Sequence, residues 1–258
     1  MCGIAGFSLV KPDAVKVDSR VLAGCLLINI EHRGRHATGM AWTETDENGL
    51  LWYYSKAPVP ARQFGENISL MPRHSRRALL HVRYATTGSP QQNENNHPII
   101  VPSHSGGSII GTHNGIIDNH RDLMADMNAD YIGEVDSQVL FHMVGREDFK
   151  PEMLRSVRGS AAFAYVDNEN PTDIKLVRTT TRPLWLAQST NGSVVWASEE
   201  EALLDAMKMV KLQADFVMEV PEWTMITIRD GVLSEVLQIP TVRGGQRQQS
   251  LFLADSFT

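Results

Sequence analysis

Residues 1–10 read MCGIAGFSLV. The apolar residues predict a strand that begins almost at the terminus of the chain. Gly3, Ala5 and Gly6 are unusual there, because glycine weakens a strand interior unless a ligand or another backbone must approach closely. The small residues therefore indicate that the strand leaves space around Cys2, and hence a site.

Cys2 acquires special chemistry if Met1 is removed, since one residue then carries both a thiol and an α-amine. An α-amine has an ordinary pKa of about 7.7–8.0 and a thiol about 8.5, so near neutral pH the amine can accept the thiol proton, directly or through one water. Nucleophile and base are then supplied together. Taken alone, a cysteine at position two is a weak indication. Cys25 lies in the apolar stripe of a predicted helix and is expected to be a core residue.

The bulk properties are those of an ordinary globular protein, with 258 residues, 42% hydrophobic and 21% charged. We expect one domain over residues 1–241 and a C-terminal tail, 242–258. The tail begins rich in Gly, Gln and Arg and ends SLFLADSFT, which indicates a flexible linker whose apolar end docks locally or on a partner.

The charge balance excludes several classes of partner. Lys and Arg number 24 against 30 Asp and Glu, a net charge of -6, and no basic stripe is present, which argues against nucleic acid. No apolar run approaches the roughly 18 residues that span a bilayer, and no basic segment is followed by an apolar one, so neither a membrane anchor nor an export signal is expected. Two cysteines are too few for a disulfide framework and favour the cytoplasm.

The pattern along the chain predicts more strands than helices. An apolar stripe from Val17 to Glu31 predicts a helix packed on a sheet, and Ser198 with Glu201 predicts a capping box for a helix to about Met209. Further helices are expected at Asn119–Met127 and Asp136–Val144, and strands at Gly39–Trp42, Leu50–Tyr54, Ala78–Tyr84, Ser108–Thr112, Ser160–Val166, Ile174–Val177, around Trp185 and Trp196, and at Met225–Ile228 and Leu233–Ile239. Sheets covered by helices on their outer faces fit this pattern.

A set of short motifs follows in a fixed order. They are MCGIAG at 1–6, HRG at 32–34 with Thr38-Gly39, HVRYATTG at 81–88, NHP at 96–98, HNGII at 113–117, and VDS at 135–137. The ordered set resembles class II glutamine amidotransferase domains, the family of glucosamine-6-phosphate synthase, amidophosphoribosyltransferase and asparagine synthetase. The likeness continues to about residue 240, and unrelated chains rarely supply all the pieces in order.

The resemblance implies an α+β fold of the N-terminal-nucleophile hydrolase type, a four-layer αββα sandwich of two antiparallel sheets. It also implies that Cys2 attacks the side-chain amide of glutamine. Asn114 and Gly115 match the family's oxyanion hole, and an amide side chain beside a glycine N–H does supply two donors at once. The alternative interpretation of Asn114-Gly115 is a plain turn between strands.

Glutamine is a zwitterion, so its carboxylate favours a bidentate cation and its ammonium a carboxylate. Arg83 matches the family's carboxylate-binding arginine, with the Thr86 hydroxyl assisting and Tyr84 also in the substrate-binding segment. Asp136 matches the ammonium-binding aspartate. The alternative for Asp136 is a helix cap, and both roles can hold together.

Two further residues are assigned by the resemblance. Arg33 is similar to an arginine that orients the nucleophile in the glucosamine-synthase branch, and His97 falls in a loop that lines the pocket there. A loop histidine is more often a solvated surface group. The sequence departs from the family at Arg35-His36, so the salt links of that turn are expected to differ, and the motifs are divided between branches.

No cofactor and no metal are expected. His113 and His120 with Asp118 give no compact ligand pattern, and the family's chemistry uses no metal. Gly106-Gly107 and Gly244-Gly245 lack the strand-to-helix context of a phosphate-binding loop.

The sequence thus predicts hydrolysis of L-glutamine to glutamate and ammonia through a glutamyl thioester. The ammonia is expected to pass to a separate synthetase or amidoligase, docked at the mouth of the site or at the Leu251–Phe257 end. Homo-oligomerisation is left open. Two alternatives remain: an N-terminal-cysteine amidase acting on another γ-glutamyl or acyl amide, and a catalytically silent regulatory homologue.

Overall fold

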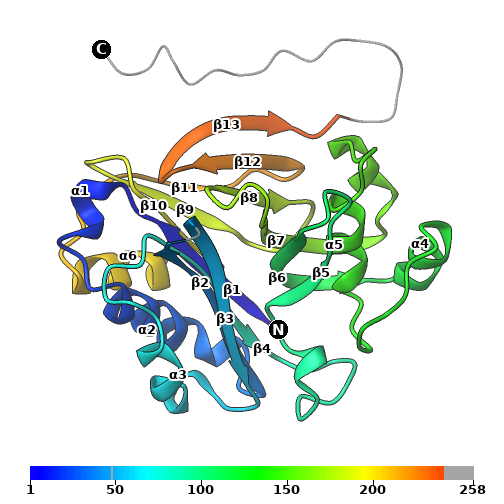
Figure 1. Cartoon of the computed structure of the whole chain (residues 1–258), viewed down its shortest axis with the longest axis horizontal. Coiled ribbons are helices and arrows are strands. Elements are labelled where there is room, and N and C mark those ends of the chain that lie inside the picture. Colours follow the sequence, from blue (N-terminus) through cyan, green and yellow to red (C-terminus); the bar gives the residue numbers. More distant parts are fainter. Residues whose placement is uncertain (48, 241–258) are drawn as a thin grey trace.

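The computed structural model describes residues 1–47 and 49–240, which form two antiparallel sheets (Figure 1). The first sheet has seven strands in the order β11-β9-β10-β1-β4-β2-β3, and the second has six in the order β13-β12-β8-β7-β6-β5. The strands are β1 Gly3–Ser8, β2 Ala37–Asp46, β3 Gly49–Ala57, β4 Arg77–Arg83, β5 Ile99–Pro102, β6 Ser108–Ile117, β7 Gly159–Asp167, β8 Asp173–Arg178, β9 Trp185–Ser189, β10 Val194–Ala197, β11 Ala214–Glu219, β12 Thr224–Arg229 and β13 Val232–Gln238.

Helices cover the outer face of each sheet. The first sheet packs against α2 (Ser19–Ile30), α6 (Glu200–Met209) and α3 (Gly65–Ser69), and the second against α4 (His120–Asp126) and α5 (Gln138–Val144). A third apolar cluster lies between the two sheets. A short helix, α1 (Lys11–Ala14), and four 3-10 turns complete the described elements. The predicted four-layer αββα sandwich is confirmed.

The opening strand occupies the centre of the first sheet, between β10 and β4. All six residues of β1 are buried, because both faces of the sheet are covered. Ala5 and Phe7 point to the helices while Ile4 points between the sheets, as the alternation of a strand requires.

The structure corrects the interpretation of Gly6. A Cβ atom on this residue would lie 2.3 Å from the Trp196 ring and 2.4 Å from the carbonyl oxygen of Ala78. The missing side chain therefore makes room for an indole in the core, and not for chemistry at Cys2. Gly3 does border the site, since its Cβ would lie 3.2 Å from the side chain of Arg33.

The capping box predicted at Ser198 is wrong. Helix α6 has Glu199 at its N-cap, with no side-chain cap. The Ser198 hydroxyl instead accepts from the Ile4 N–H at 3.0 Å and donates to the Ile4 carbonyl. The serine bridges to β1, a contact across 194 residues that no local pattern reveals.

Most expected elements are present, with differences at their limits. The strand expected at Ser108–Thr112 continues to Ile117, and β5 and β11 had no counterpart in the sequence interpretation. Both missed strands are short and lie at or near a sheet edge, where one face or one side is less buried and the alternation signal is weak.

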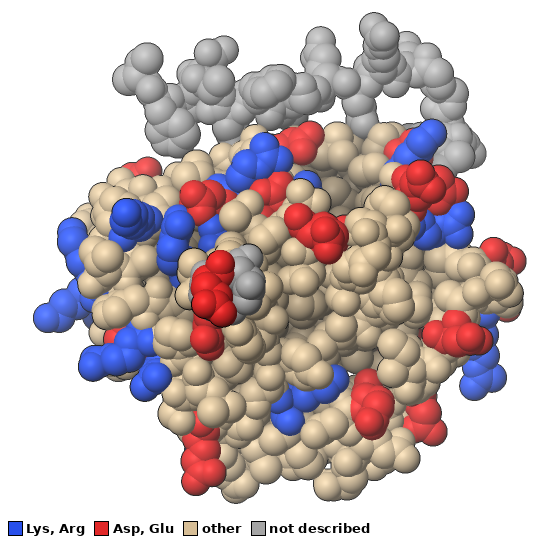
Figure 2. All heavy atoms as spheres, in the orientation of Figure 1, with Lys and Arg blue, Asp and Glu red and all other residues tan. Residues whose placement is uncertain are grey.

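Acidic and basic side chains are interspersed on the face shown in Figure 2, in keeping with the mixed charge of the sequence. Within residues 1–47 and 49–240, no helix is long and apolar enough to cross a membrane. The predicted tail, 242–258, with its Leu251–Phe257 end, lies outside the described residues, so the domain division stays a prediction.

Candidate active site

Strand pairing brings Cys2 to the end of β4. Because β1 and β4 are antiparallel and Gly3 faces Val82, the residue before β1 meets the residues after β4. The Cys2 sulfur accepts from the Tyr84 N–H at 3.4 Å and donates to the Tyr84 carbonyl, with Sγ and O 3.6 Å apart. Figure 1 shows this N-terminal end of β1 in the middle of the molecule.

Several groups act on the pKa of the Cys2 thiol, and their net effect is to raise it. Burial raises the pKa of Cys2, and Asp136 adds to this, while the Tyr84 backbone, the N-terminal ammonium and Arg83 act in the opposite direction. Since burial dominates, the thiol is held neutral until a base removes its proton.

Arg33 ties the nucleophile to a second element. Its Nε donates to the Cys2 carbonyl at 2.9 Å, and its Nη1 donates to the Glu199 carboxylate at 2.7 Å. The same Glu199 oxygen contacts His32 Nε2 at 3.0 Å. Arg33 is 9% exposed, and a buried guanidinium held at both ends restricts where the Cys2 backbone can lie.

Asn114 and Gly115 lie inside β6, opposite Ala162 and Ala161, so the interpretation as a turn is wrong. The Asn114 side chain is 1% exposed, and its Nδ2 has no hydrogen-bond partner among the described residues. A buried amide donor without a partner is costly in a folded protein unless it serves a ligand. Asn114 Nδ2 is therefore a candidate donor to a ligand.

The Gly115 amide points to the open edge of β6. Ala161, which faces it, uses both backbone groups on Thr179, so the Gly115–Ala161 pair is a non-hydrogen-bonded one. On the same edge, the His113 carbonyl contacts His81 Nε2 at 3.0 Å and the Ile117 N–H donates to Asp136 at 2.6 Å. The Gly115 N–H therefore faces the site between these two contacts.

Gly115 also has no room for a side chain. A Cβ atom there would lie 1.9 Å from the Ser160 carbonyl oxygen and 2.4 Å from His113 Nε2. Backbone and ring thus approach this position from both sides, which explains a glycine in a strand interior.

Arg83 is buried and anchors the loop that follows β4. Its Nη1 donates to Asn96 Oδ1 at 2.8 Å, and its Nη2 donates to the carbonyls of Thr87 and Gly88 at 2.5 and 2.8 Å. A cavity of about 320 Å³ opens beside this loop. It is lined by Thr87, Gly88, His120, Arg121, Tyr131, Gly133 and Glu134.

Asp136 lies two residues before α5 and does not cap it. The N-cap is Ser137, and the Asp136 carboxylate accepts from the Ile117 N–H instead. One carboxylate oxygen remains available to a ligand. Arg83 lowers and Asp136 raises the pKa of Cys2, so a positive and a negative charge both act on the thiol.

Three buried histidines, His81, His97 and His113, lie close to the site, and burial favours their neutral form. His97 stacks on His81 with ring centroids 4.0 Å apart, and His113 Nδ1 contacts the Ser137 hydroxyl at 2.8 Å. Burial lowers the pKa of His81 to about 3, that of His97 well below its ordinary value, and that of His113. His97 is 4% exposed, so the surface interpretation of this residue is wrong.

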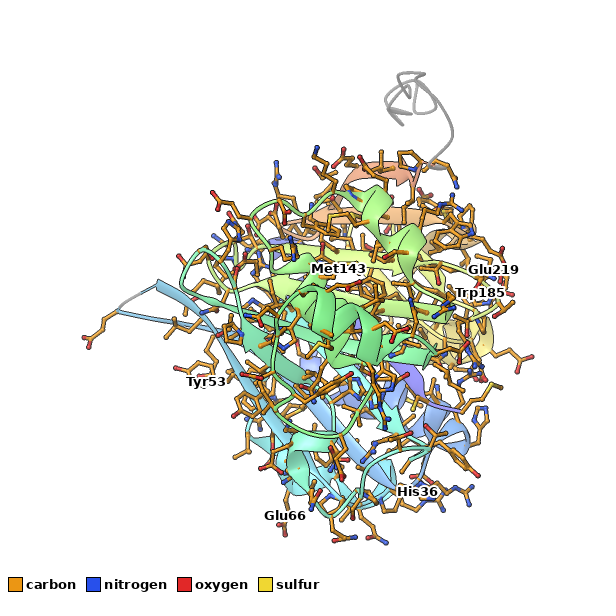
Figure 3. All side chains as sticks on the ribbon, turned by 90° about the vertical axis from the view of Figure 1, so that its right-hand side faces the viewer. His36, Tyr53, Glu66, Met143, Trp185 and Glu219 are labelled. Atoms are coloured by element: carbon orange, nitrogen blue, oxygen red, sulfur yellow. The ribbon has the colours of Figure 1, made fainter. Side chains whose placement is uncertain are left out.

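Tyr84 and Thr86 lie at the surface of the loop. Tyr84 contributes its backbone to Cys2 while its ring is 49% exposed and stacks on His36, 5.0 Å between centroids. His36 accepts from the Ala85 N–H at 2.8 Å, and Figure 3 shows it at the edge of the molecule. At the Arg35-His36 departure, the His36 ring therefore supports the loop after β4, and Arg35 lies 3.6 Å from Glu31.

The described residues contain no group of three or more His, Cys, Asp or Glu side chains arranged to hold a metal. His113 contacts Ser137, whereas His120 contacts Tyr131, so these two rings serve different neighbours.

Sequence reasoning missed two supporting residues, Asn96 and Glu199, although Asn96 falls within the NHP motif that carried the resemblance. Asn96 holds Arg83, and Glu199 holds Arg33 from 166 residues away. Asn96 has this role because it contacts the guanidinium of Arg83, and Glu199 because it contacts that of Arg33. Both contacts follow from the tertiary structure.

Two stacked antiparallel sheets between helical layers, with a cysteine at the head of a central strand, define an N-terminal-nucleophile hydrolase fold. Two solved structures share it: a glutamine phosphoribosylpyrophosphate amidotransferase from B. subtilis (TM-score 0.72, 21% identity, 93% of this chain and 49% of that one) and one titled as the allosteric regulatory enzyme of purine biosynthesis (TM-score 0.69, 22%, 93% and 49%).

Sequence comparison points to glutamine amidotransferases. Residues 81–205 match the glutamine amidotransferase domain family. Glutamine--fructose-6-phosphate aminotransferases are 28% identical over 79% of this chain (Escherichia coli K12, 32% of the relative's length) and 27% identical over 99% of it (Shouchella clausii, 40%). The chain is similar to glutamine amidotransferase domains over residues 81–205, and to these relatives over up to 99% of its length. It spans about a third to two fifths of the length of these curated relatives.

Proposed function

We propose that this protein hydrolyses L-glutamine to L-glutamate and ammonia once Met1 has been removed. The observation that carries the proposal is the convergence of a half-buried thiol, an unused buried donor on Asn114, and the opposite charges of Arg83 and Asp136 at one end of the sandwich. Substrate class follows from the charges, because a free amino acid needs a cation and a carboxylate at its two ends.

The first half-reaction forms a thioester. The Cys2 α-amine takes the thiol proton as Sγ bonds to the side-chain carbonyl carbon of glutamine, and the carbonyl oxygen becomes an oxyanion. Asn114 Nδ2 and the Gly115 N–H donate to that oxygen. The oxyanion collapses, the C–N bond breaks, and the leaving nitrogen takes the proton from the α-ammonium and departs as ammonia.

The second half-reaction releases glutamate. The α-amine removes a proton from water as the hydroxide bonds to the thioester carbon, and the same two donors hold the second oxyanion. When the C–S bond breaks, the sulfur recovers the proton from the α-ammonium. Arg33 acts here by positioning, since it binds the Cys2 carbonyl and touches no reacting atom.

A bidentate carboxylate contact through both Nη atoms of Arg83 needs a rearrangement, because both N–H groups of Nη2 already donate to loop carbonyls. We propose that glutamine replaces part of these contacts, with Thr86 and Tyr84 closing over it and His97 lining the pocket. This exchange would explain why Arg83, the proposed substrate-binding residue, also holds the loop at Thr87 and Gly88.

We further propose that a separate synthetase or amidoligase in the cytoplasm receives the ammonia. Three exposed apolar side chains border the site: Tyr84, Ile116 and Tyr131 are 49, 44 and 36% exposed. Exposed apolar groups around a polar site are typical of a docking surface, and a docked acceptor would limit loss of ammonia to water.

Intact-protein mass spectrometry before and after treatment with a glutamine-like electrophile tests the proposal. We expect loss of Met1, one label on Cys2, and glutamate release abolished in Cys2→Ala. Retained activity in Cys2→Ala would refute the assignment of the nucleophile. Preference for a substrate with a blocked α-amine would favour the alternative amidase, and an uncleaved Met1 with no labelling would favour a silent homologue.

A further inference from the structure

Arg182 reaches the N-terminus from the loop between β8 and β9. Its Nη1 lies 2.7 Å from the Met1 sulfur, and its Nε donates to the Ser160 hydroxyl at 2.9 Å. Ser160 is the residue whose carbonyl closes on Gly115. The guanidinium is therefore held between β7, the strand that pairs with β6 beside Gly115, and the residue that must leave before Cys2 can react.

The loop that presents Arg182 is strained and firmly held. Thr181 has a positive φ of 49°, a conformation that a β-branched residue rarely adopts. Its N–H donates to Glu222 at 3.0 Å, and the Thr180 hydroxyl donates to the Gly159 carbonyl at 3.2 Å. Such strain persists only where the surroundings enforce it, and it is concentrated at functional sites.

Within the part of the chain that the structure describes, Arg182 has no charged partner near the N-terminus. By contrast, Arg33 is paired with Glu199 at 2.7 Å, and Arg83 is influenced by the charge of Asp136 without an ion pair between them. His113 is neutral at neutral pH, because burial lowers its pKa, and Arg182 lowers it further. No carboxylate of the described residues lies within ion-pair distance of Arg182, since Glu222 meets only the Thr181 backbone.

We propose that Arg182 is a positioning residue whose unpaired positive charge keeps the Cys2 α-amine unprotonated near neutral pH. The inference rests on the proposed function. Like charges repel, so a fixed guanidinium destabilises an ammonium group and leaves the neutral amine free to take the thiol proton.

The size of the effect follows from the geometry. Five covalent bonds separate the Met1 sulfur from the Cys2 nitrogen, about 6 Å at full stretch. Adding the 2.7 Å contact places Arg182 Nη1 within about 9 Å of the amine. At that distance, with an effective dielectric constant between about 20 and 80, the amine pKa falls by roughly 0.3 to 1.3 units.

The test is the pH dependence of kcat/KM for glutamine hydrolysis by Met1-processed protein, for wild type, Arg182→Gln and Arg182→Lys. We expect the acid limb of Arg182→Gln to move up by roughly 0.3 to 1.3 pH units, with the alkaline plateau unchanged within about twofold, and Arg182→Lys to keep the wild-type limb. The shift should shrink in 1 M salt, because exposed charges are screened.

Arg158→Gln is the matched control, since Arg158 is an exposed arginine paired with Asp122 at 3.3 Å on the helix α4 side. The acid limb of the kcat/KM profile of Arg158→Gln should coincide with that of wild type. If Arg182→Gln unfolds, Arg182→Met preserves more of the side-chain packing and is measured instead. An unmoved limb in the charge-free variants, or an equal shift in Arg182→Lys, would overturn the inference.

Alkylation of Cys2 by a neutral haloacetamide over the same pH range gives a readout that does not require turnover. Wild-type protein that alkylates at Cys2 but releases no glutamate would refute the proposed function alone. If wild-type protein hydrolyses glutamine, but the pH profiles of alkylation and of activity are the same in wild type and in the Arg182 variants, this inference alone is refuted.

Discussion

Asn114→Ala should abolish most of the activity while leaving stability nearly unchanged. In the free protein the Asn114 Nδ2 is buried and makes no hydrogen bond to the described residues. Its removal therefore breaks no such bond and relieves a desolvation cost of about 1–3 kcal/mol. The cavity left behind costs a comparable amount, so the free energy of unfolding should change by less than about 1 kcal/mol, or about 2–4 °C in Tm.

The effect on the reaction is much larger, because the donor acts where charge develops. Loss of one oxyanion donor costs about 2.7–4 kcal/mol of transition-state stabilisation, or about 10²–10³ in kcat. KM should stay close to that of wild type, since the ground-state carbonyl depends less on the donor. Glutamate release in a coupled dehydrogenase assay gives kcat and KM, and calorimetry gives Tm.

Thr112→Val is the matched control. Thr112 lies two residues earlier on β6, on the same face, and its hydroxyl is also buried without a described partner. We expect kcat within about twofold of wild type, because the hydroxyl is about 7 Å along the strand from Asn114. A kcat for Asn114→Ala within about fivefold of wild type, or an equal loss in Thr112→Val, would show that the orphan amide is not an oxyanion donor.

Three other outcomes follow from the geometry. Gly6→Ala should lower the free energy of unfolding by about 1–3 kcal/mol in urea titrations, since the new Cβ would lie 2.3 Å from the Trp196 ring; an unchanged midpoint would contradict this. Glu199→Gln should reduce kcat about tenfold with little change in KM, because Arg33 loses its carboxylate and Cys2 its alignment; a change confined to KM would argue for substrate contact instead. The pKa of His97 is depressed, so its contribution to stability is full above pH 6.5 and is lost as pH falls below that value, at up to about 1.4 kcal/mol per pH unit; stability of His97→Gln should depend less steeply on pH between 6.5 and 5, and equal slopes would exclude His97 as the cause.

Much of the fold could be predicted because the decisive signals are local. Alternating apolar residues predicted β1, β2, β4 and β7, and the apolar stripe predicted α2. The failures occur where tertiary contacts override local chemistry. Ser198 has the sequence of a cap but bonds to Ile4, and Gly6 has the look of a site residue but makes room for Trp196.

The candidate site divides in the same way. Motif order singled out Cys2, Arg83, Asn114, Gly115 and Asp136, and these lie at one end of the sandwich. Arg182 could not be assigned in that way, because nothing in the local pattern shows that a residue 181 positions away meets Met1.

The sequence by itself determined the chemistry available: a nucleophile that can carry its own base, donors for an oxyanion, and opposite charges for a zwitterion. These are properties of residue types. The tertiary structure decided which edge of β6 faces Cys2, which guanidinium is paired, and which buried donor is unused. Those facts depend on antiparallel register and on contacts across more than 150 residues, and local propensity carries no information about them.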